Sequence, residues 1–160
     1  VMQRLQGWDC KLIYSDPYRM PEEMEKKLNC EYVSLETLLR ESDVVSLHCP
    51  LTEQTRGMIG KEQLAMMKPN AIIVNEARGA VIDDKALVEA LQNGTIWGAA
   101  IDTWEKEPLD PNDPLVKMEK VIATSHLGAA TRETVIRCFS IGYQNILRQI
   151  HGEELVNRIV

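Results

Sequence analysis

The sequence predicts an α/β fold in which a parallel β-sheet is covered by helices on both faces. Short apolar runs typical of strands alternate along the chain with segments whose apolar residues recur at helical spacing. The strand segments are also apolar without interruption, as in residues 71–74, and such strands are usually buried on both faces. The chain has 160 residues, of which 44% are hydrophobic, which is enough for one domain with an ordinary core.

The N-terminal half is expected to supply three strands, with helices between them. Residues 1–7 look like the end of a helix that closes at a glycine. A helix is expected to begin at Pro21, where proline and glutamates suit a helix N-terminus, and another at Ser34, whose side chain can cap it. The predicted strands cover residues 11–16, 31–33 and 43–50.

The C-terminal half is expected to continue the alternation. A short helix over 61–68 halts before Pro69, and Asp83 can cap a helix that ends at Gly94. A long helix should start at Thr131. The further predicted strands cover residues 71–75, 98–102 and 121–124. The apolar face of the last helix is expected to carry Val135, Cys138, Phe139, Ile146, Leu147 and Ile150.

Composition excludes several classes of function. A formal net charge of -6 argues against a general nucleic-acid-binding surface, which would need clustered Lys and Arg. No apolar run is long enough to span a membrane. The four cysteines lack a Cys-x-x-Cys spacing, which disfavours a zinc site or a disulfide framework. We therefore expect a cytoplasmic protein without a metal.

Polar side chains lie just beyond nearly every predicted strand. Ligands of open α/β sheets bind in the crevice beyond the carboxyl ends of the strands. The sequence therefore predicts that a binding site lies along this edge. The residues at these positions are Asp16, His48, Arg78, Asp102, Glu107 and His126.

Three of these residues could together support hydride transfer between a 2-hydroxy acid and a 2-oxo acid. Arg78 offers a planar cation for the substrate carboxylate. His126 could exchange a proton with the substrate oxygen near neutral pH, and Glu107 could favour and orient the protonated ring. Each residue also has a structural explanation, because an arginine, a glutamate or a histidine in these positions can simply occupy a solvated turn.

Asp16 has two interpretations. In a dinucleotide-binding sheet, an acid at this position hydrogen-bonds the adenosine ribose and favours NAD over NADP. Alternatively, it is the ordinary acid of an Asp-Pro turn with Pro17.

Four segments resemble those of the D-isomer-specific 2-hydroxyacid dehydrogenase family. Residues 48–55 (HCPLTEQT) are similar to that family's loop beside the nicotinamide, and residues 75–79 (NEARG) to its substrate-arginine turn. Residues 98–108 (GAAIDTWEKEP) resemble the segment that carries an aspartate and the catalytic glutamate, and residues 125–128 (SHLG) the catalytic-histidine turn. The segments occur in the family's order, and the likeness covers essentially the whole chain.

The resemblance implies a Rossmann-type nucleotide-binding domain over residues 1–160, NAD as cofactor and a homodimer. It also implies a 2-hydroxy or 2-oxo acid substrate of the glyoxylate/hydroxypyruvate or 3-phosphoglycerate type. Arg78, Glu107 and His126 would be catalytic. The implied cofactor-binding residues are Asp16, Pro17, His48, Cys49, Pro50, Thr55, Asn75, Ala77, Arg78, Asp102, His126 and Gly128.

The sequence departs from the family pattern in three places. Ser125 stands where proline is usual, and Glu76 places an acid beside Arg78. No Gly-x-Gly-x-x-Gly motif occurs, so the resemblance implies that the first strand and the phosphate loop would precede Val1. That strand would lie between the strands ending near Asp16 and His48, and we expect a partial domain that binds NAD poorly alone.

Two alternatives to an NAD-dependent dehydrogenase stay open. The chain could be a corepressor-like NAD sensor with the same fold, or an inactive fragment.

Overall fold

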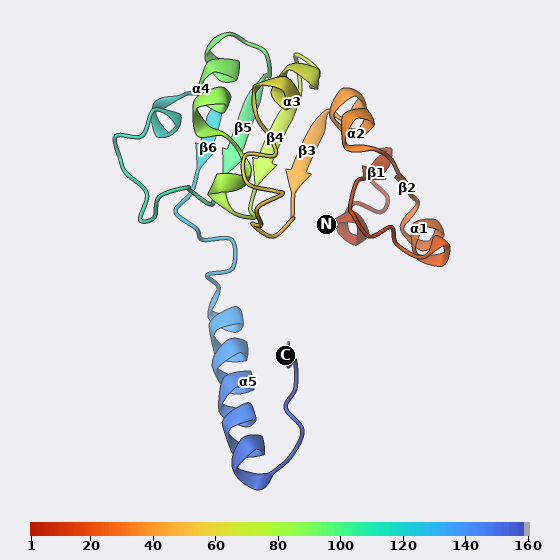
Figure 1. The fold of residues 1–160 in the computed structure, drawn as a ribbon, viewed down its shortest axis with the longest axis vertical. Helices are drawn as coiled ribbons and strands as arrows, with labels where there is room; N and C mark the ends of the chain where they lie inside the picture. Colours follow the sequence, from red (N-terminus) through yellow and green to blue (C-terminus); the bar gives the residue numbers. More distant parts are fainter. Residues whose placement is uncertain (159–160) are drawn as a thin grey trace. The chain divides into compact units, whose positions relative to one another are not determined.

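The computed structural model describes residues 1–158, which form two compact units. The first unit comprises Val1–Ser125, and the second begins at His126. Helices and strands alternate through the first unit, and the second is built around one long helix (Figure 1). We describe the two units in turn.

The chain begins with a small two-stranded parallel sheet. Strand β1 (Leu12–Tyr14) pairs with β2 (Cys30–Tyr32), and Tyr14 stands opposite Tyr32. Helix α1 (Glu22–Leu28) connects the two strands and ends at Asn29 in the left-handed conformation. The helix expected over residues 1–7 is only a 3₁₀ turn, η1 (Met2–Arg4), which has no side-chain cap and no buried residue to stabilise it.

A four-stranded parallel sheet forms the main part of the first unit. Its strands lie in sequence order: β3 (Val44–Leu47), β4 (Ile72–Asn75), β5 (Gly98–Ile101) and β6 (Val121–Ala123). In register, Val45, Ile73, Ala99 and Val121 form one row across the sheet. All four carboxyl ends therefore lie along the same edge.

Three helices cover one face of this sheet. They are α2 (Leu35–Glu41), α3 (Lys61–Met66) and α4 (Asp84–Gln92), and the expected caps Ser34 and Asp83 both accept a backbone N–H. Two 3₁₀ turns, η2 (Gly79–Val81) and η3 (Leu115–Lys117), follow β4 and β5. The core contains side chains from both layers, among them Leu39, Leu64, Leu87, Val45, Ile73 and Ala99.

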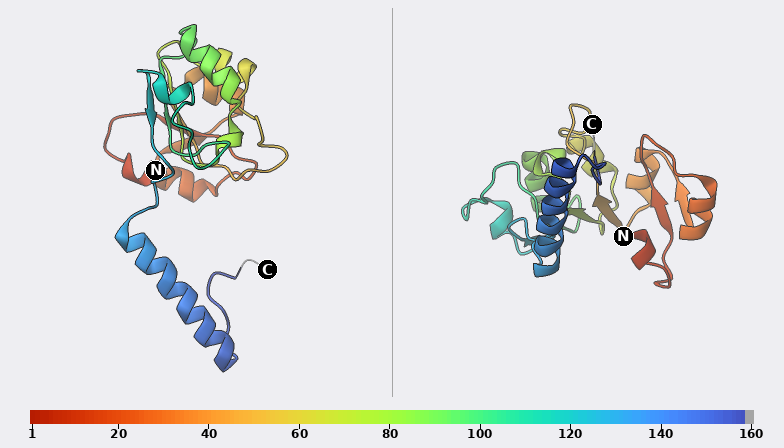
Figure 2. Two further views of the ribbon diagram at one scale, coloured as in Figure 1. Left: turned by 90° about the vertical axis from the view of Figure 1, so that its left-hand side faces the viewer. Right: turned by 90° about the horizontal axis from the view of Figure 1, so that it is seen from below.

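The predicted parallel α/β fold is confirmed, and the sheet is interrupted where the sequence predicted. Within residues 1–158, β1 and β2 form one sheet and β3–β6 another, so β1 is not paired with β3. The two groups of strands are separate in Figure 1 and in the right-hand view of Figure 2. Within Val1–Ser125, helices pack on one face of the larger sheet and not on both as expected; on the other face Val44 is 58% exposed and Ile122 is 69% exposed.

The second unit contains α5 (Arg132–His151), the long helix expected to start at Thr131. The Thr131 side chain caps it, and the helix ends at Gly152 in the left-handed conformation. The side chain of Asn145 exchanges two hydrogen bonds with the backbone of Val156, and these fold the following segment back onto the helix. No residue of α5 is buried. No helix in the described part of the chain is long and apolar enough to cross a membrane.

Candidate active site

The turn after β4 presents Arg78 to solvent. Asn75 ends the strand and is 1% exposed. Its Oδ1 accepts the Ala77 N–H at 3.0 Å, and its Nδ2 donates to the Arg78 carbonyl oxygen at 3.1 Å. The Arg78 Nη1 donates to the Ala77 carbonyl oxygen at 2.7 Å, while the side chain as a whole is exposed. Asn75 and Ala77, both predicted as cofactor-binding residues, therefore shape the turn that carries Arg78.

The neighbouring acid does not pair with Arg78 in this structure. Glu76 is exposed, and the turn directs the Arg78 Nη1 to a backbone carbonyl oxygen instead. An exposed, planar guanidinium is suited to binding a carboxylate through two parallel hydrogen bonds. The departure at Glu76 therefore leaves the predicted role of Arg78 intact.

Gly79 packs the Arg78 turn directly against the segment that follows β5. A Cβ atom on Gly79 would lie 2.0 Å from the carbonyl carbon of Trp104 and 2.2 Å from the backbone nitrogen of Glu105. Both neighbours are backbone atoms and have no rotamer through which to move away. Only glycine fits here, and its fit fixes how close the two segments come.

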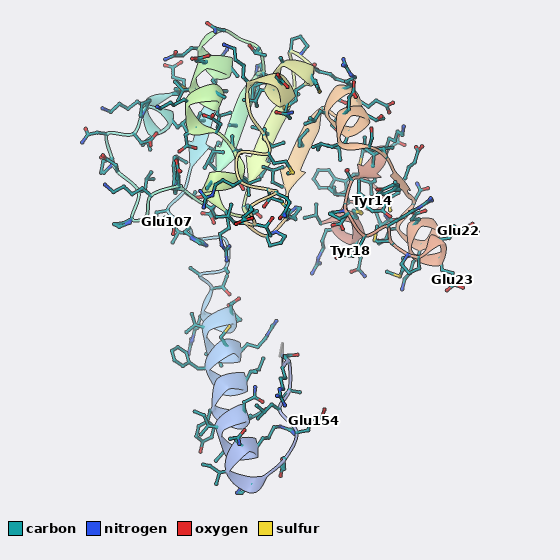
Figure 3. The ribbon with its side chains drawn as sticks, viewed as in Figure 1. Tyr14, Tyr18, Glu22, Glu23, Glu107 and Glu154 are labelled. Atoms are coloured by element: carbon teal, nitrogen blue, oxygen red, sulfur yellow. The ribbon has the colours of Figure 1, made fainter. Side chains whose placement is uncertain are left out.

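The segment after β5 holds Glu107 and Asp102 by hydrogen bonds. The Trp104 backbone N–H donates to Glu107 Oε1 at 3.1 Å, and the indole Nε1 donates to the Thr124 carbonyl oxygen at 2.7 Å. The Thr124 hydroxyl donates to Asp102 Oδ1 at 2.5 Å. Asp102 and Trp104 are buried, whereas Glu107 is exposed at the end of the sheet to which the strand arrows point (Figure 3). The first unit thus joins the Arg78 turn to the loops of Glu107 and Asp102.

His126 opens the second unit. It follows β6, which ends at Ala123, and is exposed together with Gly128. Its φ is +57°, a left-handed conformation that is uncommon for a residue other than glycine and concentrates at functional turns. The joint action of His126 with Arg78 and Glu107 remains a prediction.

The candidate adenosine-binding residue Asp16 follows β1, and the candidate cofactor-binding residue Cys49 follows β3. Asp16 and Pro17 are exposed, and Asp16 Oδ1 accepts the Tyr18 N–H at 2.8 Å. Burial raises the pKa of the half-buried Cys49 thiol, and the charge of the Asp16 carboxylate raises it further.

The loop from His48 to Thr55 is closed by its own side chains. His48 Nε2 lies 2.9 Å from Ser46 Oγ. The Thr55 hydroxyl donates to the Pro50 carbonyl oxygen at 2.7 Å and accepts the Thr52 N–H at 2.8 Å. Thr55 therefore stabilises the loop, and its predicted contact with the cofactor is untested.

Two carboxylates, those of Asp16 and Asp102, suit the two ends of a dinucleotide. The exposed Asp16 carboxylate suits ribose hydroxyls, and Asp102, held by Thr124, lies on the outlet of β5. No glycine-rich phosphate-binding motif occurs in the sequence. Among residues 1–158, no group of three or more His, Cys, Asp or Glu side chains is arranged to hold a metal ion.

Sequence reasoning did not single out three residues that build this site: Gly79, Trp104 and Thr124. The glycine directly after Arg78 was a visible signal, since a conformationally permissive residue often marks close backbone approach. The pairing of Thr124 with Asp102 joins residues far apart in the sequence and leaves no local pattern.

Comparison with known proteins identifies the family. Residues 1–128 match the NAD binding domain of the D-isomer specific 2-hydroxyacid dehydrogenases. The chain is 47% identical over its full length to 49% of a glyoxylate reductase from Korarchaeum cryptofilum. It is 42% identical, over 92% of its length, to 46% of a glyoxylate/hydroxypyruvate reductase B from Pectobacterium carotovorum.

A solved structure agrees with both matches. The crystal structure of D-lactate dehydrogenase with NAD+ from Lactobacillus jensenii superimposes with a TM-score of 0.91 at 32% identity, covering 99% of this chain and 51% of that one. The chain spans about half the length of the relatives that it matches. On the evidence of its Arg78 turn, its parallel sheet and these matches, the chain belongs to the D-isomer specific 2-hydroxyacid dehydrogenase family, within the NAD binding domain.

Proposed function

We propose that this chain supplies the cofactor-binding and catalytic groups of an NAD-dependent oxidoreductase that interconverts D-2-hydroxy acids and 2-oxo acids. The observation that carries the proposal is the geometry of the Arg78 turn. The Asn75 side chain forms hydrogen bonds with the backbone of Ala77 and Arg78, and Gly79 packs the turn against the segment that leads to Glu107. An exposed cation and a carboxylate on two interlocked loops suit an anionic substrate that exchanges a proton.

Each catalytic group has a separate task. When bound, NAD would supply or accept the hydride at the substrate's C2 carbon. Arg78 would bind the substrate carboxylate. His126 would donate a proton to the 2-oxo oxygen during reduction and take it back during oxidation. Glu107, which the Trp104 N–H holds in place, would orient the imidazole and favour its protonated form.

The cofactor would lie along the carboxyl edge of the two sheets. Asp16 would accept hydrogen bonds from the adenosine ribose, which favours NAD over NADP. Asp102 would meet the nicotinamide carboxamide, since the Thr124 hydroxyl fixes its side chain at the β5 outlet. The backbone around Cys49, Pro50 and Ala77 would line the space between these ends.

The relatives support a small 2-oxo acid as substrate. Similar proteins are named glyoxylate reductase and glyoxylate/hydroxypyruvate reductase. We therefore favour the glyoxylate/hydroxypyruvate type over the 3-phosphoglycerate type.

Turnover by the full-length protein tests this function. NADH oxidation should be fastest with glyoxylate or hydroxypyruvate in a panel that also includes pyruvate and phosphohydroxypyruvate. Arg78→Ala and His126→Ala should each lower kcat/KM at least about 100-fold, because each removes a group that interacts with the reacting substrate. Arg56→Ala, which removes an exposed arginine from the loop before α3, is the matched control and should leave kcat/KM unchanged. Parent-like turnover by Arg78→Ala or His126→Ala would refute the assigned roles.

A further inference from the structure

The loop after β1 carries a cation as well as an acid, and α1 holds that cation. Arg19 Nε donates to Glu25 Oε1 at 2.8 Å, and its Nη2 donates to Glu25 Oε2 at 2.8 Å. Both carboxylate oxygens are therefore engaged by one guanidinium in a two-pronged pair. The Arg19 side chain is 61% exposed, so the pair lies at the surface edge of the loop.

Glu25 is an unusual residue for an amphipathic helix because it is buried, with only 7% of its surface exposed. The Tyr14 hydroxyl donates to its Oε1 at 2.7 Å. The hydrogen bonds from Arg19 and then from Tyr14 lower the pKa of the Glu25 carboxyl to about 2, and the same pair raises the pKa of Arg19. The ion pair is thus fully charged throughout the neutral range.

Two tyrosines connect this pair to Asp16. The Arg19 guanidinium lies 5.5 Å from the centre of the Tyr32 ring, and the Tyr32 hydroxyl donates to the Asp16 carbonyl oxygen at 3.2 Å. The Tyr14 hydroxyl accepts the Met20 N–H at 2.8 Å, and the two tyrosine rings pack edge to face. The loop that carries Asp16 is therefore fixed at both of its ends, with Arg19 near the carboxyl ends of β1 and β2.

A loop with both charges could accept either kind of dinucleotide. In nucleotide-binding sheets, an acid after the second strand pairs with the 2′-hydroxyl of NAD, whereas a nearby arginine accommodates the 2′-phosphate of NADP. Here the arginine's charge is balanced by a buried carboxylate, and the fork formed by its Nε and Nη2 is occupied. The Asp16 carboxylate is exposed, and one of its oxygens accepts a backbone N–H.

We propose that Glu25 is a specificity-determining positioning residue, which holds Arg19 against α1 so that the ribose meets the Asp16 carboxylate and not a free guanidinium. Glu25 itself touches no cofactor in this scheme. It sets the choice between a ribose 2′-hydroxyl and a 2′-phosphate through the arginine that it retains. The proposal rests on the proposed function, because it refines the cofactor selectivity of the same site.

Direct binding of NADH and of NADPH to the full-length protein, measured by cofactor fluorescence, tests the proposal. Glu25→Gln keeps the side-chain shape but removes the charge and replaces one acceptor oxygen with a donor, so Arg19 is released. We expect the Kd for NADPH to fall at least tenfold while the Kd for NADH changes less than threefold. In Arg19→Gln/Glu25→Gln, the affinity for NADPH should return to the parent value, because the released cation is gone.

The control is Glu23→Gln, which makes the same charge change on an exposed residue of the same helix (Figure 3). It should leave both constants unchanged. If Glu25→Gln does not fold, Glu25→Asp takes its place, since the shorter acid cannot reach both Arg19 nitrogens. It should strengthen NADPH binding at least threefold.

The outcomes separate the two proposals. A parent protein that prefers NADPH, or that binds neither dinucleotide, overturns the proposed cofactor and the role of Glu25 with it. A parent that prefers NADH, combined with Glu25 variants that gain no affinity for NADPH, overturns the role of Glu25 alone. Equal gains in the single and double variants likewise exclude Arg19 as the released group.

Discussion

At the scale of single residues, Gly79 determines how closely the Arg78 turn approaches the segment after β5. Gly79→Ala would place a methyl group at 2.0 Å from a backbone carbon, so the two segments must separate. Overpacking of this kind costs about 1–3 kcal/mol, and we expect urea denaturation to show at least that loss together with reduced turnover. Gly142→Ala is the control, since no atom lies within 4 Å of its Cβ, and it should stabilise α5 by about 0.5–1 kcal/mol. Parent-like stability of Gly79→Ala would contradict the packing described.

Asp84 provides a pH-dependent test at the same scale. Burial, and then the charges of Glu105, Asp113 and Asp83, raises the pKa of its carboxyl to about 6. Because the folded state favours the protonated acid, the stabilisation is complete below the unfolded pKa and is lost as pH rises through about 6. Asp84→Asn should flatten this loss between pH 4 and 6 and raise stability at pH 7 by about 1 kcal/mol after solvent screening. An unchanged slope in denaturation curves across this range would show that Asp84 is not the responsible group.

Single residues also show what sequence can predict about the site. The positions of Arg78 and Glu107 beyond β4 and β5 were predictable, because both residues follow apolar runs in segments that resemble the family, whereas their catalytic roles stay a prediction. The contacts that fix them were not predictable, because Gly79 meets Trp104 and Thr124 meets Asp102 only after the strands have aligned. The Arg19–Glu25 pair was hidden for a different reason, since a glutamate in the first turn of a helix ordinarily suggests a solvated residue.

At the scale of elements, local capping chemistry made most helices predictable. Ser34 and Asp83 each accept a backbone N–H from the first turn of their helix, as predicted, and Thr131 does the same where a long helix was expected to start. Residues 1–7 lack such a cap, and there a single 3₁₀ turn forms. The parallel pairing of the strands was predictable from their alternation with helices, whereas the strand order β3-β4-β5-β6 was not part of the prediction.

Capping of α4 gives the element-scale prediction. Asp83 accepts the Ala86 N–H at 3.0 Å, so Asp83→Ala should lower the free energy of unfolding by about 1 kcal/mol. Asp83→Asn is the matched variant, because asparagine also caps helices well but carries no charge. Thermal or urea denaturation should therefore rank Asp83→Asn close to the parent and Asp83→Ala below both. Equal losses in the two variants would assign the effect to charge and not to the cap.

At the scale of the whole molecule, burial is concentrated in one part of the chain. The core joins β3–β5 to α2, α3 and α4. In the β1–β2 sheet only the Tyr14 side chain is buried, and it is not part of that core, while no residue of α5 is buried. Amides open by local unfolding at a free-energy cost that follows the buried contacts of their element. Stability should therefore be distributed very unevenly along the 160 residues.

Amide hydrogen exchange of this chain measures that distribution. Amides of β4 and β5 should exchange slowest, those of β1 and β2 faster, and those of α5 at least about 100-fold faster than β4, because a helix without tertiary packing is marginal in water. Protection of α5 equal to that of β4 in the 160-residue chain would contradict the burial pattern, since it would require contacts that the second unit does not contain.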